Sequence, residues 1–466
     1  MLFKIAFRNV FRNRRRSLMT LLAIAVGAVA IVLFGDFIGF IRVALKTMTI
    51  ERVGHLTVFR SGYFDYGAGN PLAFGIDDYQ GVMGLIQNDA EIKPLLNVIT
   101  PTVSVAGIAG NFDISASKTF FGTGFVPSDR DRMLLWDEQG VFTGRVRKPS
   151  GLHDDDEVGG VVGVGLARVL GFCDSLGIKN CPARPPAVAP PSAAEKEAPD
   201  IAALAGAEQD EGPTSPGDAR PRLDLLAATA GGAPNVISLF INSAERQSAR
   251  ELDESFIAMH LKLAQRLLYG RNEPKAMAIV LQLHQTKDTD VVRARLKAIF
   301  QQHHLDLEVR DFVERQPFYK EAVDMFDAIF LFIAAIMGVI VLFTVVNTMG
   351  MSVMERTNEI GTARALGVRR SGTRNVFLIE GILLGAFGAT VGVIVGQVIA
   401  MAFNHTGFTW TPPGNAAPTP LRVLTSGVMP LLLGAWLGLV LMATVAAVIP
   451  ANRAARLKVV DALRHV

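Results

Sequence analysis

Several short stretches combine residue types that could do chemistry. The run HDDDE at His153–Glu157 offers imidazole and carboxylate groups, which could bind a metal ion. His303 and His304 are adjacent, and GVGLAR at Gly163–Arg168 partly imitates a dinucleotide-binding loop. We favour an ordinary interpretation of each. A run of acids beside glycine is typical of a solvated turn and the paired histidines of a loop, and GVGLAR lacks the third glycine of the dinucleotide motif.

Motifs with stricter spacing are missing from the 466 residues, which contain no GxSxG, no HExxH and no GxxxxGK[ST] phosphate loop. We therefore predict that this chain has no catalytic, cofactor-binding or metal site. Its two cysteines are too few for a four-cysteine zinc site. A net charge of +3 is too small to indicate nucleic-acid binding.

The elements that would position any functional residue are dominated by apolar segments. Half of the residues are hydrophobic and only 19% are charged, which is typical of a partly membrane-embedded protein. Crossing about 30 Å of hydrocarbon takes roughly 20 helical residues. Four segments meet that requirement, at residues 18–40, 326–350, 376–403 and 427–449. The first could be a signal peptide cleaved after Ala28–Ala30, but its continuing apolar run favours an uncleaved anchor.

The basic residues predict the topology, because lysine and arginine gather on the cytoplasmic side of a membrane. They lie before the first span, between the second and third spans, and after the fourth: Lys4, Arg8, Arg12 and Arg14–Arg16; Arg356, Arg364, Arg369, Arg370 and Arg374; Arg453, Arg456, Lys458 and Arg464. The expected fold class is four transmembrane α-helices with a large mixed α+β extracytoplasmic domain between the first two. We assign 1–17 to a cytoplasmic interfacial helix, 41–325 to the external domain, 351–375 to a cytoplasmic helix and loop, 404–426 to an external loop, and 450–466 to a cytoplasmic tail.

Alternating patterns predict the α+β character of the external domain. Residues 97–125 read as β-hairpins that turn at Gly110–Asn111, and KAMAIVLQLH and LDLEVRDF read as strands around a helix at Asp288–Gln302. Residues 182–234 are rich in alanine, proline and glycine, so we predict a flexible insertion with a helical turn near Leu223–Ala228. Cys173 and Cys181 would lie outside the cytoplasm, where we favour a disulfide over two free thiols.

Glycines recur along the third span. Gly381, Gly385, Gly388, Gly392 and Gly396 form two overlapping series of small residues, which allow helix backbones to approach closely in a membrane. Static packing within the subunit is one interpretation. A smooth face along which a neighbouring helix shifts is the other.

A charged stretch, SVMERTNEIGTARALGVRR at Ser352–Arg370, separates the second and third spans. We predict a helix from about Met351 to Leu366, with Met354, Ile360, Ala363 and Leu366 towards lipid or protein and Gly367 as its C-terminal cap. Its polar face would present Glu355, Arg356, Glu359 and Arg364 to the cytoplasm. It could simply lie at the interface, or it could dock onto an intracellular partner.

Three parts of the sequence together resemble the FtsX-like (MacB-type) permeases of ABC transporters. They are FRNVFRNRRRSLMTLLAIAVG near the start, NTMGMSVMERTNEIGTARALGVRR between the second and third spans, and IPANRAARLKVVDALRHV at the end. ERVGHLTVFRSGYF and VERQPFYKEAVDMF are similar to the lipoprotein-releasing (LolC/LolE-like) branch. The order of one span, a large external domain and three spans also fits.

The resemblance implies a non-catalytic permease in the bacterial inner membrane, with its large domain in the periplasm. It would form a dimer with a second copy or a paralogue, and ATP and Mg²⁺ would lie on two copies of a separate ATPase. In this family the helix between spans two and three is the coupling helix on the ATPase. Here its residues would be Glu355, Arg356, Glu359, Ile360, Gly361, Arg364 and Gly367.

The implied function is mechanotransmission, in which ATP-driven closure of the ATPases moves the external domains. The first hypothesis for the cargo is a lipoprotein or lipid-like molecule, handed to a periplasmic carrier. The alternatives are efflux of drugs or peptides through an adaptor and outer-membrane channel, and FtsX-like activation of a cell-wall hydrolase. Membrane lipids are the other expected partners, and nucleic acid is not one.

Overall fold

The computed structural model describes residues 2–12, 14–67, 69–140, 151–179, 181, 219–247, 249–270, 274–410, 419–425, 427–459 and 462. The chain divides into two compact units. The helical unit comprises Met1–Lys46, Gln316–Trp410 and Thr419–Val466, and the mixed unit comprises Thr47–Arg315.

The helical unit is built on four long apolar helices. They are α2 (Arg14–Val53), α12 (Pro317–Glu355), α14 (Arg370–His405) and α15 (Met429–Arg456), with the shorter α1 (Leu2–Arg12) and α13 (Thr357–Ala365) and a small hairpin of β10 (Thr409–Trp410) and β11 (Thr419–Pro420). All four long helices have the length and hydropathy needed to cross a membrane. The first three predicted spans fall within them, and the fourth, 427–449, begins two residues before α15.

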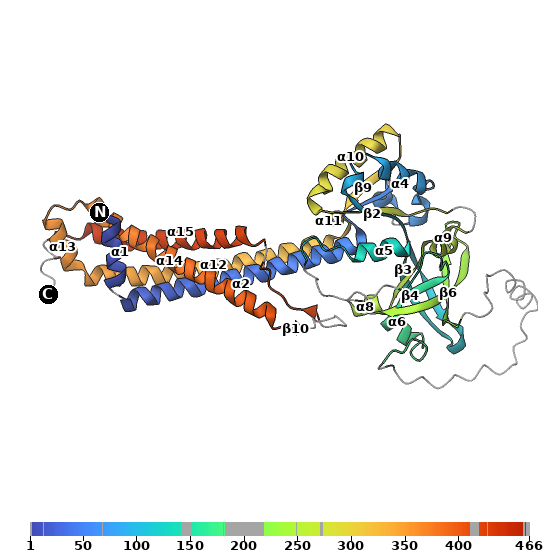
Figure 1. The fold of residues 1–466 in the computed structure, drawn as a ribbon, viewed down its shortest axis with the longest axis horizontal. Coiled ribbons are helices and arrows are strands. Elements are labelled where there is room, and N and C mark those ends of the chain that lie inside the picture. The colour runs from blue at the N-terminus through green and yellow to red at the C-terminus, as the bar shows by residue number, and fades with distance from the viewer. Residues whose placement is uncertain are drawn as a thin grey trace, which may run out of the picture. The chain divides into compact units, whose positions relative to one another are not determined.

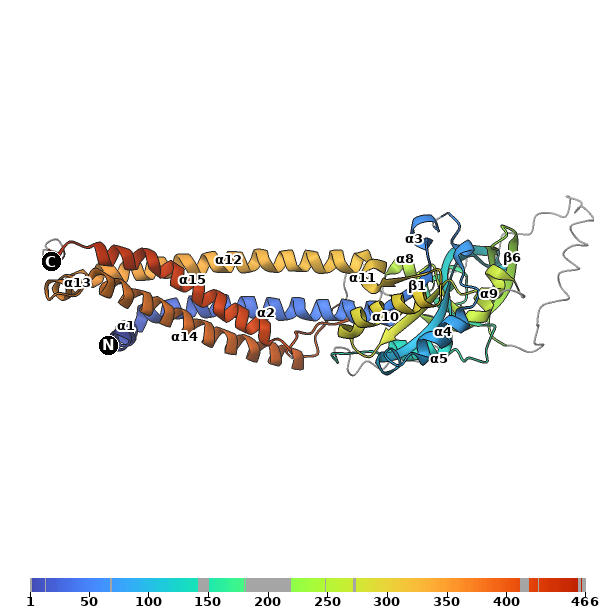
Figure 2. The same cartoon turned by 90° about the horizontal axis from the view of Figure 1, so that it is seen from above.

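Small residues bring the long helices together. The core of the helical unit includes Ala443, Ala446, Ala447, Ala451 and Ala454 of α15, all buried. Helices α14 and α15 run side by side in both views (Figures 1 and 2), and α1 runs across their direction. Lipid offers apolar surface as good as that of another helix, so close backbone approach through small side chains, rather than hydrophobic burial, favours such packing.

The mixed unit contains a nine-stranded sheet in the order β3-β7-β4-β6-β5-β2-β8-β1-β9. One half is a βαββαβ unit in which neighbouring strands are antiparallel. Its elements are β1 (Leu56–Arg60), α4 (Tyr79–Asn88), β2 (Leu96–Asn111), β8 (Ala278–Leu283), α10 (Thr289–Gln302) and β9 (Leu307–Asp311). Ile86 of α4 and Leu296 of α10 are fully buried against the strands.

The other half of the mixed unit is a closed ring of strand pairings. The long strand β2 continues beyond β8 and pairs with both β3 and β5, so the order β2-β3-β7-β4-β6-β5 returns to β2. The added strands are β3 (Ala116–Phe125), β4 (Gly159–Gly163), β5 (Arg222–Ala228), β6 (Pro234–Glu245) and β7 (Phe256–His260). Helix α9 (Leu261–Tyr269) contributes Leu263 and Leu267 to the core of this ring.

Shorter elements connect these strands and helices. The α-helical segments are α3 (Tyr63–Tyr66), α5 (Pro127–Leu134), α6 (Val164–Val169), α8 (Arg250–Asp253) and α11 (Phe312–Arg315), and the 3-10 turns are η1 (Pro71–Phe74), η2 (Lys93–Leu95), η3 (Phe112–Ile114) and η4 (Thr286–Asp288).

Some of the strands, helices and turns predicted for this unit are confirmed, and one predicted turn is wrong. KAMAIVLQLH contains β8, LDLEVRDF contains β9, and the helix between them is α10, as predicted. The hairpin of β2 and β3 is present, but the predicted turn at Gly110–Asn111 is wrong. The ladder continues to the pair Asn111–Ala116, and η3 makes the turn.

The predicted extent of the flexible insertion is wrong at its C-terminal end. Residues 182–218 lie outside the described residues, but Leu223–Ala228, predicted to form a helical turn, belong to strand β5. The strand alternates, with Leu223, Leu225 and Ala227 buried in the ring core and Asp224, Leu226 and Ala228 more exposed. An alternation with period two buries one face of a strand, and the alanine-rich composition nearby obscures it.

The structure joins Cys173 to Cys181 in a disulfide across eight residues. This is the disulfide predicted from the sequence. The bridge closes a short loop immediately after α6, in the mixed unit.

Candidate functional site

The predicted coupling helix is formed by two helices rather than one. Helix α12 continues through Met351 to Glu355, and Arg356 (φ −103°, ψ 14°) separates it from α13. The predicted helix start at Met351 is therefore wrong. The second span and the first four residues of the charged stretch, Ser352–Glu355, belong to the same helix, and the stretch continues in α13 after the break at Arg356.

The predicted C-terminal cap at Gly367 has the expected geometry. Gly367 adopts φ +97°, a conformation that residues with a side chain rarely adopt. The N–H of Gly367 donates to the carbonyl of Arg364, and the N–H of Val368 donates to the carbonyl of Ala363. These two hydrogen bonds are those of a Schellman motif, which ends the helix sharply.

The acidic side chains of this region are held by arginines from the N-terminal segment. Arg12, at the end of α1, donates to both carboxylate oxygens of Glu359 at 2.6 and 2.7 Å. Arg16, in the first turn of α2, makes a bidentate contact with Glu355 at 2.5 Å to each oxygen. The hydrogen bond from Arg12 is the main reason that the pKa of Glu359 lies below its ordinary value. We name these two pairs the N-terminal clasp.

Arg356 turns inward instead of facing solvent. Its guanidinium donates to Glu380 of α14 at 2.9 Å and lies 5.3 Å from the ring centre of Phe377. Asn9 of α1 donates to the same carboxylate oxygen of Glu380 at 2.7 Å. Only 6% of the Glu380 side chain and 13% of the Arg356 side chain are exposed. A charge this buried must be paired, and here the pair ties α1, α14 and the α12–α13 junction together.

The remaining predicted residues contact the C-terminal segment. Arg364 donates to the backbone carbonyls of Ala455 and Leu457. Ile360 is buried. A Cβ atom added to Gly361 would lie 2.8 Å from the Cβ of Ala462, so this glycine allows the tail to pack closely on α13.

These contacts correct the predicted polar face in part. Arg356 and Arg364 turn inward, to Glu380 and to backbone carbonyls of the C-terminal segment. Glu355 and Glu359 stay about half exposed, each beside an arginine of the N-terminal segment. The large apolar side chains nearby are exposed as well, with Met354 75% and Leu366 82% exposed. Short-range pairing explains the difference, because arginine and carboxylate groups satisfy each other when helices converge.

The glycines of α14 divide between two neighbouring helices. Gly381 and Gly385 face Ala447 and Ala443 of α15, where an added Cβ would lie 2.4 and 2.8 Å from the alanine Cβ atoms. The other three face α2: Gly388 meets Ile24, Gly392 meets Ala28, and Gly396 meets Val32. All five therefore pack against helices of the same subunit, and whether the stripe is a static contact or a face along which a helix shifts stays a prediction.

The other candidate groups do not converge on a site. Within the described ranges, no group of three histidine, cysteine, aspartate or glutamate side chains could hold a metal ion. In the HDDDE run, Asp156 pairs with Arg220, and Glu157 pairs with Lys262 and Arg266. His303 caps α10, and GVGLAR spans the junction of β4 and α6.

Sequence reasoning missed the partners of the charged stretch. The sequence pattern places Arg12 and Arg16 in a cytoplasmic interfacial helix and among the basic residues that predict topology, and it does not single out Asn9, Phe377 or Glu380. One signal was present: a cluster of arginines and a cluster of glutamates were both assigned to the cytoplasmic side. Their one-to-one pairing depends on how α1 meets α13, and spacing along the chain does not encode that.

Comparison with known proteins shows that part of this chain is similar to a family of permeases. Residues 331–459, which include most of α12 and all of α13, α14 and α15, match the family model described as FtsX-like permease C-terminal. A Nitrobacter winogradskyi protein named "Macrolide export ATP-binding/permease protein MacB" is 31% identical over 214 residues, covering 44% of this chain and 30% of that protein. A Neisseria meningitidis protein named "Lipoprotein-releasing system transmembrane protein LolC" is 26% identical over 186 residues, covering 38% of this chain and 44% of that protein.

The chain thus spans less than half the length of these curated relatives. The predicted resemblance is confirmed where the match lies: residues 331–459 match the FtsX-like permease C-terminal model, in a chain similar to proteins named MacB and LolC.

Proposed function

We propose that this chain is the permease subunit of an ABC transporter, coupling a separate ATPase to work by the mixed unit. The FtsX-like permease domain carries the proposal, since it contains α13 between two helices long enough to span a membrane. The 466 residues contain no phosphate loop, so in this proposal ATP and Mg²⁺ bind to the partner ATPase.

The proposed location is a bacterial inner membrane, with α13 in the cytoplasm and the mixed unit in the periplasm. Basic residues flank the proposed cytoplasmic ends of the spans. The Cys173–Cys181 disulfide also supports this orientation, because disulfides persist in the periplasm and are rare in the cytosol.

The proposed cargo is a lipoprotein or lipid-like molecule taken from the outer leaflet, in line with the LolC relative. The MacB relative favours a second candidate, efflux of amphipathic molecules through an adaptor and channel. Native purification with lipid and protein mass spectrometry separates them. Acylated protein bound to the complex supports lipoprotein release, and an adaptor with a channel supports efflux. A co-purifying cell-wall hydrolase would contradict both.

The coupling role of α13 is tested by recruitment of the ATPase. We propose that the exposed Leu366 and Met354 enter the ATPase, while Glu359 stays paired with Arg12. Leu366→Asp should then weaken ATPase pull-down and cargo-stimulated hydrolysis with normal membrane insertion. Wild-type values in both assays would rule out contact at this end of α13.

A charge swap separates the clasp from the docking surface. Glu359→Arg alone removes the Arg12 contact and places two cations together, so it should impair coupling by a few-fold, as expected for an exposed pair. Combining it with Arg12→Glu restores an attraction and should restore coupling. The matched control is Arg8→Glu, an exposed arginine of α1 with no contact to α13 among those described. If the double variant stays impaired, Glu359 contacts the ATPase directly.

A further inference from the structure

Strand β9 lies at the edge of the sheet in the mixed unit, with β1 as its neighbour on one side. Two hydrogen bonds set the direction of its backbone groups. Ser61 N–H donates to the carbonyl of Asp306 at 3.1 Å, and Phe312 N–H donates to the carbonyl of His55 at 3.1 Å. Antiparallel pairs alternate between hydrogen-bonded and non-hydrogen-bonded positions.

This alternation leaves one side of β9 open. Glu308 and Arg310 lie in register with hydrogen-bonding positions and direct their backbone groups towards β1. Val309 and Asp311 direct theirs the other way. Within the described part of the chain, the Val309 N–H has no hydrogen-bond acceptor. The edge therefore offers a donor at the position where another strand would pair.

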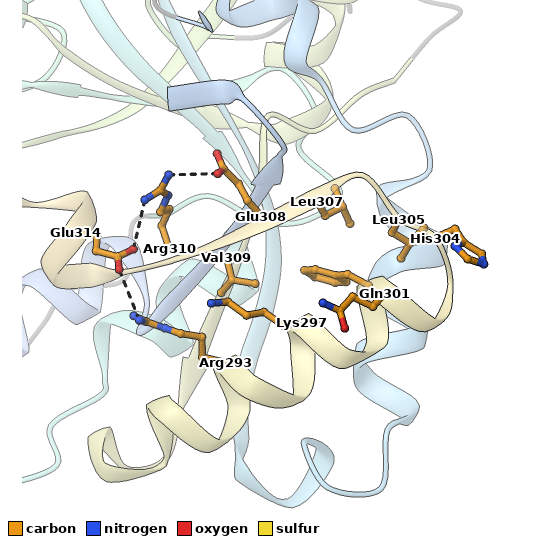
Figure 3. A pocket seen from close by; sticks show the side chains of 11 residues that line it. Arg293, Lys297, Gln301, His304, Leu305, Leu307, Glu308, Val309, Arg310 and Glu314 are labelled. Carbon is orange, nitrogen blue, oxygen red and sulfur yellow. Dashed lines mark hydrogen bonds and ion pairs between the residues drawn. The ribbon is translucent and has the colours of Figure 1, made fainter. Parts of the chain in front are cut away.

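A groove runs along this open edge. A pocket of about 580 Å³ lies between β9 and one face of α10, from which Arg293, Lys297 and Gln301 line it at successive turns (Figure 3). The adjacent face of α10 buries Leu296 and Ile299 in the core. A helix beside an open strand edge is the geometry in which an extended peptide can add a strand and place side chains against the helix.

Some charged side chains in the groove have ion-pair partners and one does not. Its two arginines are paired with acids of β9 and α11: Arg293 with Asp311 and Glu314, and Arg310 with Glu308 and Glu314. Lys297 is exposed and has no ion-pair partner among the described residues. Lys297 is thus the cation of this groove without an ion-pair partner among the described residues, although the three acids named here balance the three cations in number.

The other end carries the opposite charge. A second pocket of about 410 Å³ shares Leu305 and Leu307 with the first and is lined also by Arg60 of β1 and by three aspartates, Asp77, Asp78 and Asp306. Asp77 pairs with Lys275, and Asp78 caps α4. The exposed carboxylate of Asp306 has no partner in the described ranges. Three aspartates against one arginine leave the lining of this second pocket acidic, so the edge carries an unpaired cation at Lys297 and an unpaired carboxylate at Asp306.

We propose that the groove between β9 and α10 binds an extended segment of a partner polypeptide, which adds a strand to β9 and places an acidic side chain at Lys297 and a basic one at Asp306. A polypeptide is the occupant because its backbone supplies donors and acceptors at strand spacing. The opposite charges select a segment whose own charges are separated in the same way. The charged side chains of β9 discourage unselective edge pairing. The proposal is independent of the ATPase.

Binding of short peptides to the full chain in detergent tests this. The probes are fluorescein-labelled heptapeptides of alternating valine and threonine, with glutamate and lysine at opposite ends in either order, and an uncharged version. One charged order should bind more tightly than the others. Lys297→Glu should weaken it about fivefold, as expected when an exposed attraction becomes a repulsion. Lys287→Glu, the same change at an exposed lysine outside the groove, should leave binding unchanged.

Two further variants test the strand pairing. Val309→Pro removes the outward N–H while leaving the hydrogen bonds to β1, and should abolish binding. If this variant unfolds, Lys297→Glu with Asp306→Lys decides, because it should reverse the preferred charge order, a gain that a damaged protein cannot show. Equal binding of charged and uncharged peptides, or no reversal, overturns the proposal. So does a dimer that Val309→Pro dissociates without any peptide binding, which would make a second copy the occupant.

Discussion

At the scale of single residues, two ion pairs of the helical unit differ in burial: Arg356 with Glu380 is buried, and Arg16 with Glu355 is exposed. Both side chains of the first pair are largely buried, whereas about half of Glu355 is exposed beside Arg16. Exposed pairs contribute about 0–1 kcal/mol, because water screens the charges. Removing one member of a buried pair leaves an uncompensated charge and costs roughly 3–5 kcal/mol.

Glu380→Gln should therefore destabilise the helical unit by up to roughly 3 kcal/mol, by stranding the Arg356 charge. Glu355→Gln is the matched control and should cost at most about 1 kcal/mol. Thermal unfolding of both variants in detergent provides the comparison. Equal midpoints would show that Arg356 finds another partner.

His260 predicts a pH dependence in the mixed unit. Its Nδ1 accepts the Lys262 N–H at 3.2 Å as the N-cap of α9, and its Nε2 lies 3.1 Å from the Asp154 carbonyl. Burial lowers the pKa of His260 below 6.5, because the charged ring would be desolvated. The unfolded chain then binds the proton first, so stability is full above pH 6.5 and falls as the pH drops through that value.

His260→Asn keeps a good N-cap without a titrating group. Relative to this variant, the wild type should lose thermal stability between pH 7.5 and pH 5.5. A difference in melting temperature that stays constant over this range would show that the imidazole accepts a proton in the fold at no cost.

At the scale of elements, α14 is the helix that organises the helical unit. Its glycines contact α15 at one end and α2 along the rest, with no room for a methyl group at Gly392, where an added Cβ would lie 2.4 Å from Ala28. Gly438 of α15 has no heavy atom within 4 Å of its ideal Cβ. The two glycines therefore play different roles in helices of the same kind.

Gly392→Ala should separate α14 from α2 and destabilise the unit by about 1–3 kcal/mol, as overpacking does. Gly438→Ala should be neutral or slightly stabilising, since alanine favours helix by about 1 kcal/mol over glycine. Melting temperatures and ATPase coupling of the two variants can be compared directly. Loss of coupling with normal stability in Gly392→Ala would favour a shifting interface over a static one.

At the scale of the whole molecule, the mixed unit depends on a strand that lies near the end of a low-complexity stretch. Replacing residues 183–218 with a Gly/Ser linker should leave folding intact, on the composition of that segment. Extending the replacement to 232 removes β5, breaks its ladders with β2 and β6, and deletes Leu223 and Leu225 from the core.

The longer replacement should therefore aggregate or fail to insert, whereas the shorter one should not. Fluorescence-detected size exclusion of both proteins distinguishes them. A sharp, wild-type-like peak for the longer replacement would show that the ring of strands closes without β5.

The sequence by itself determined the features that rest on local composition and period. Four long apolar runs define the long helices, a short apolar run defines β8, alternation defines β9, and Gly367 defines the end of α13. Each of these features is set by residues that lie close together in the sequence. The resemblance to the permease family is visible in the sequence for the same reason, because the motifs of the charged stretch and the C-terminus are local patterns.

Tertiary structure alone decided which partners the charged residues meet. Glu359 lies 347 positions from Arg12, and Glu380 lies 371 from Asn9. No periodicity links such positions. The open edge of β9 likewise exists only because the sheet order places β9 last, after β1 rather than beside β8, which precedes it in the chain. Ion pairing and the exposure of a strand edge depend on how helices and strands pack in three dimensions. The sequence therefore shows which charged groups and strands exist, and only the fold determines which of them are in contact.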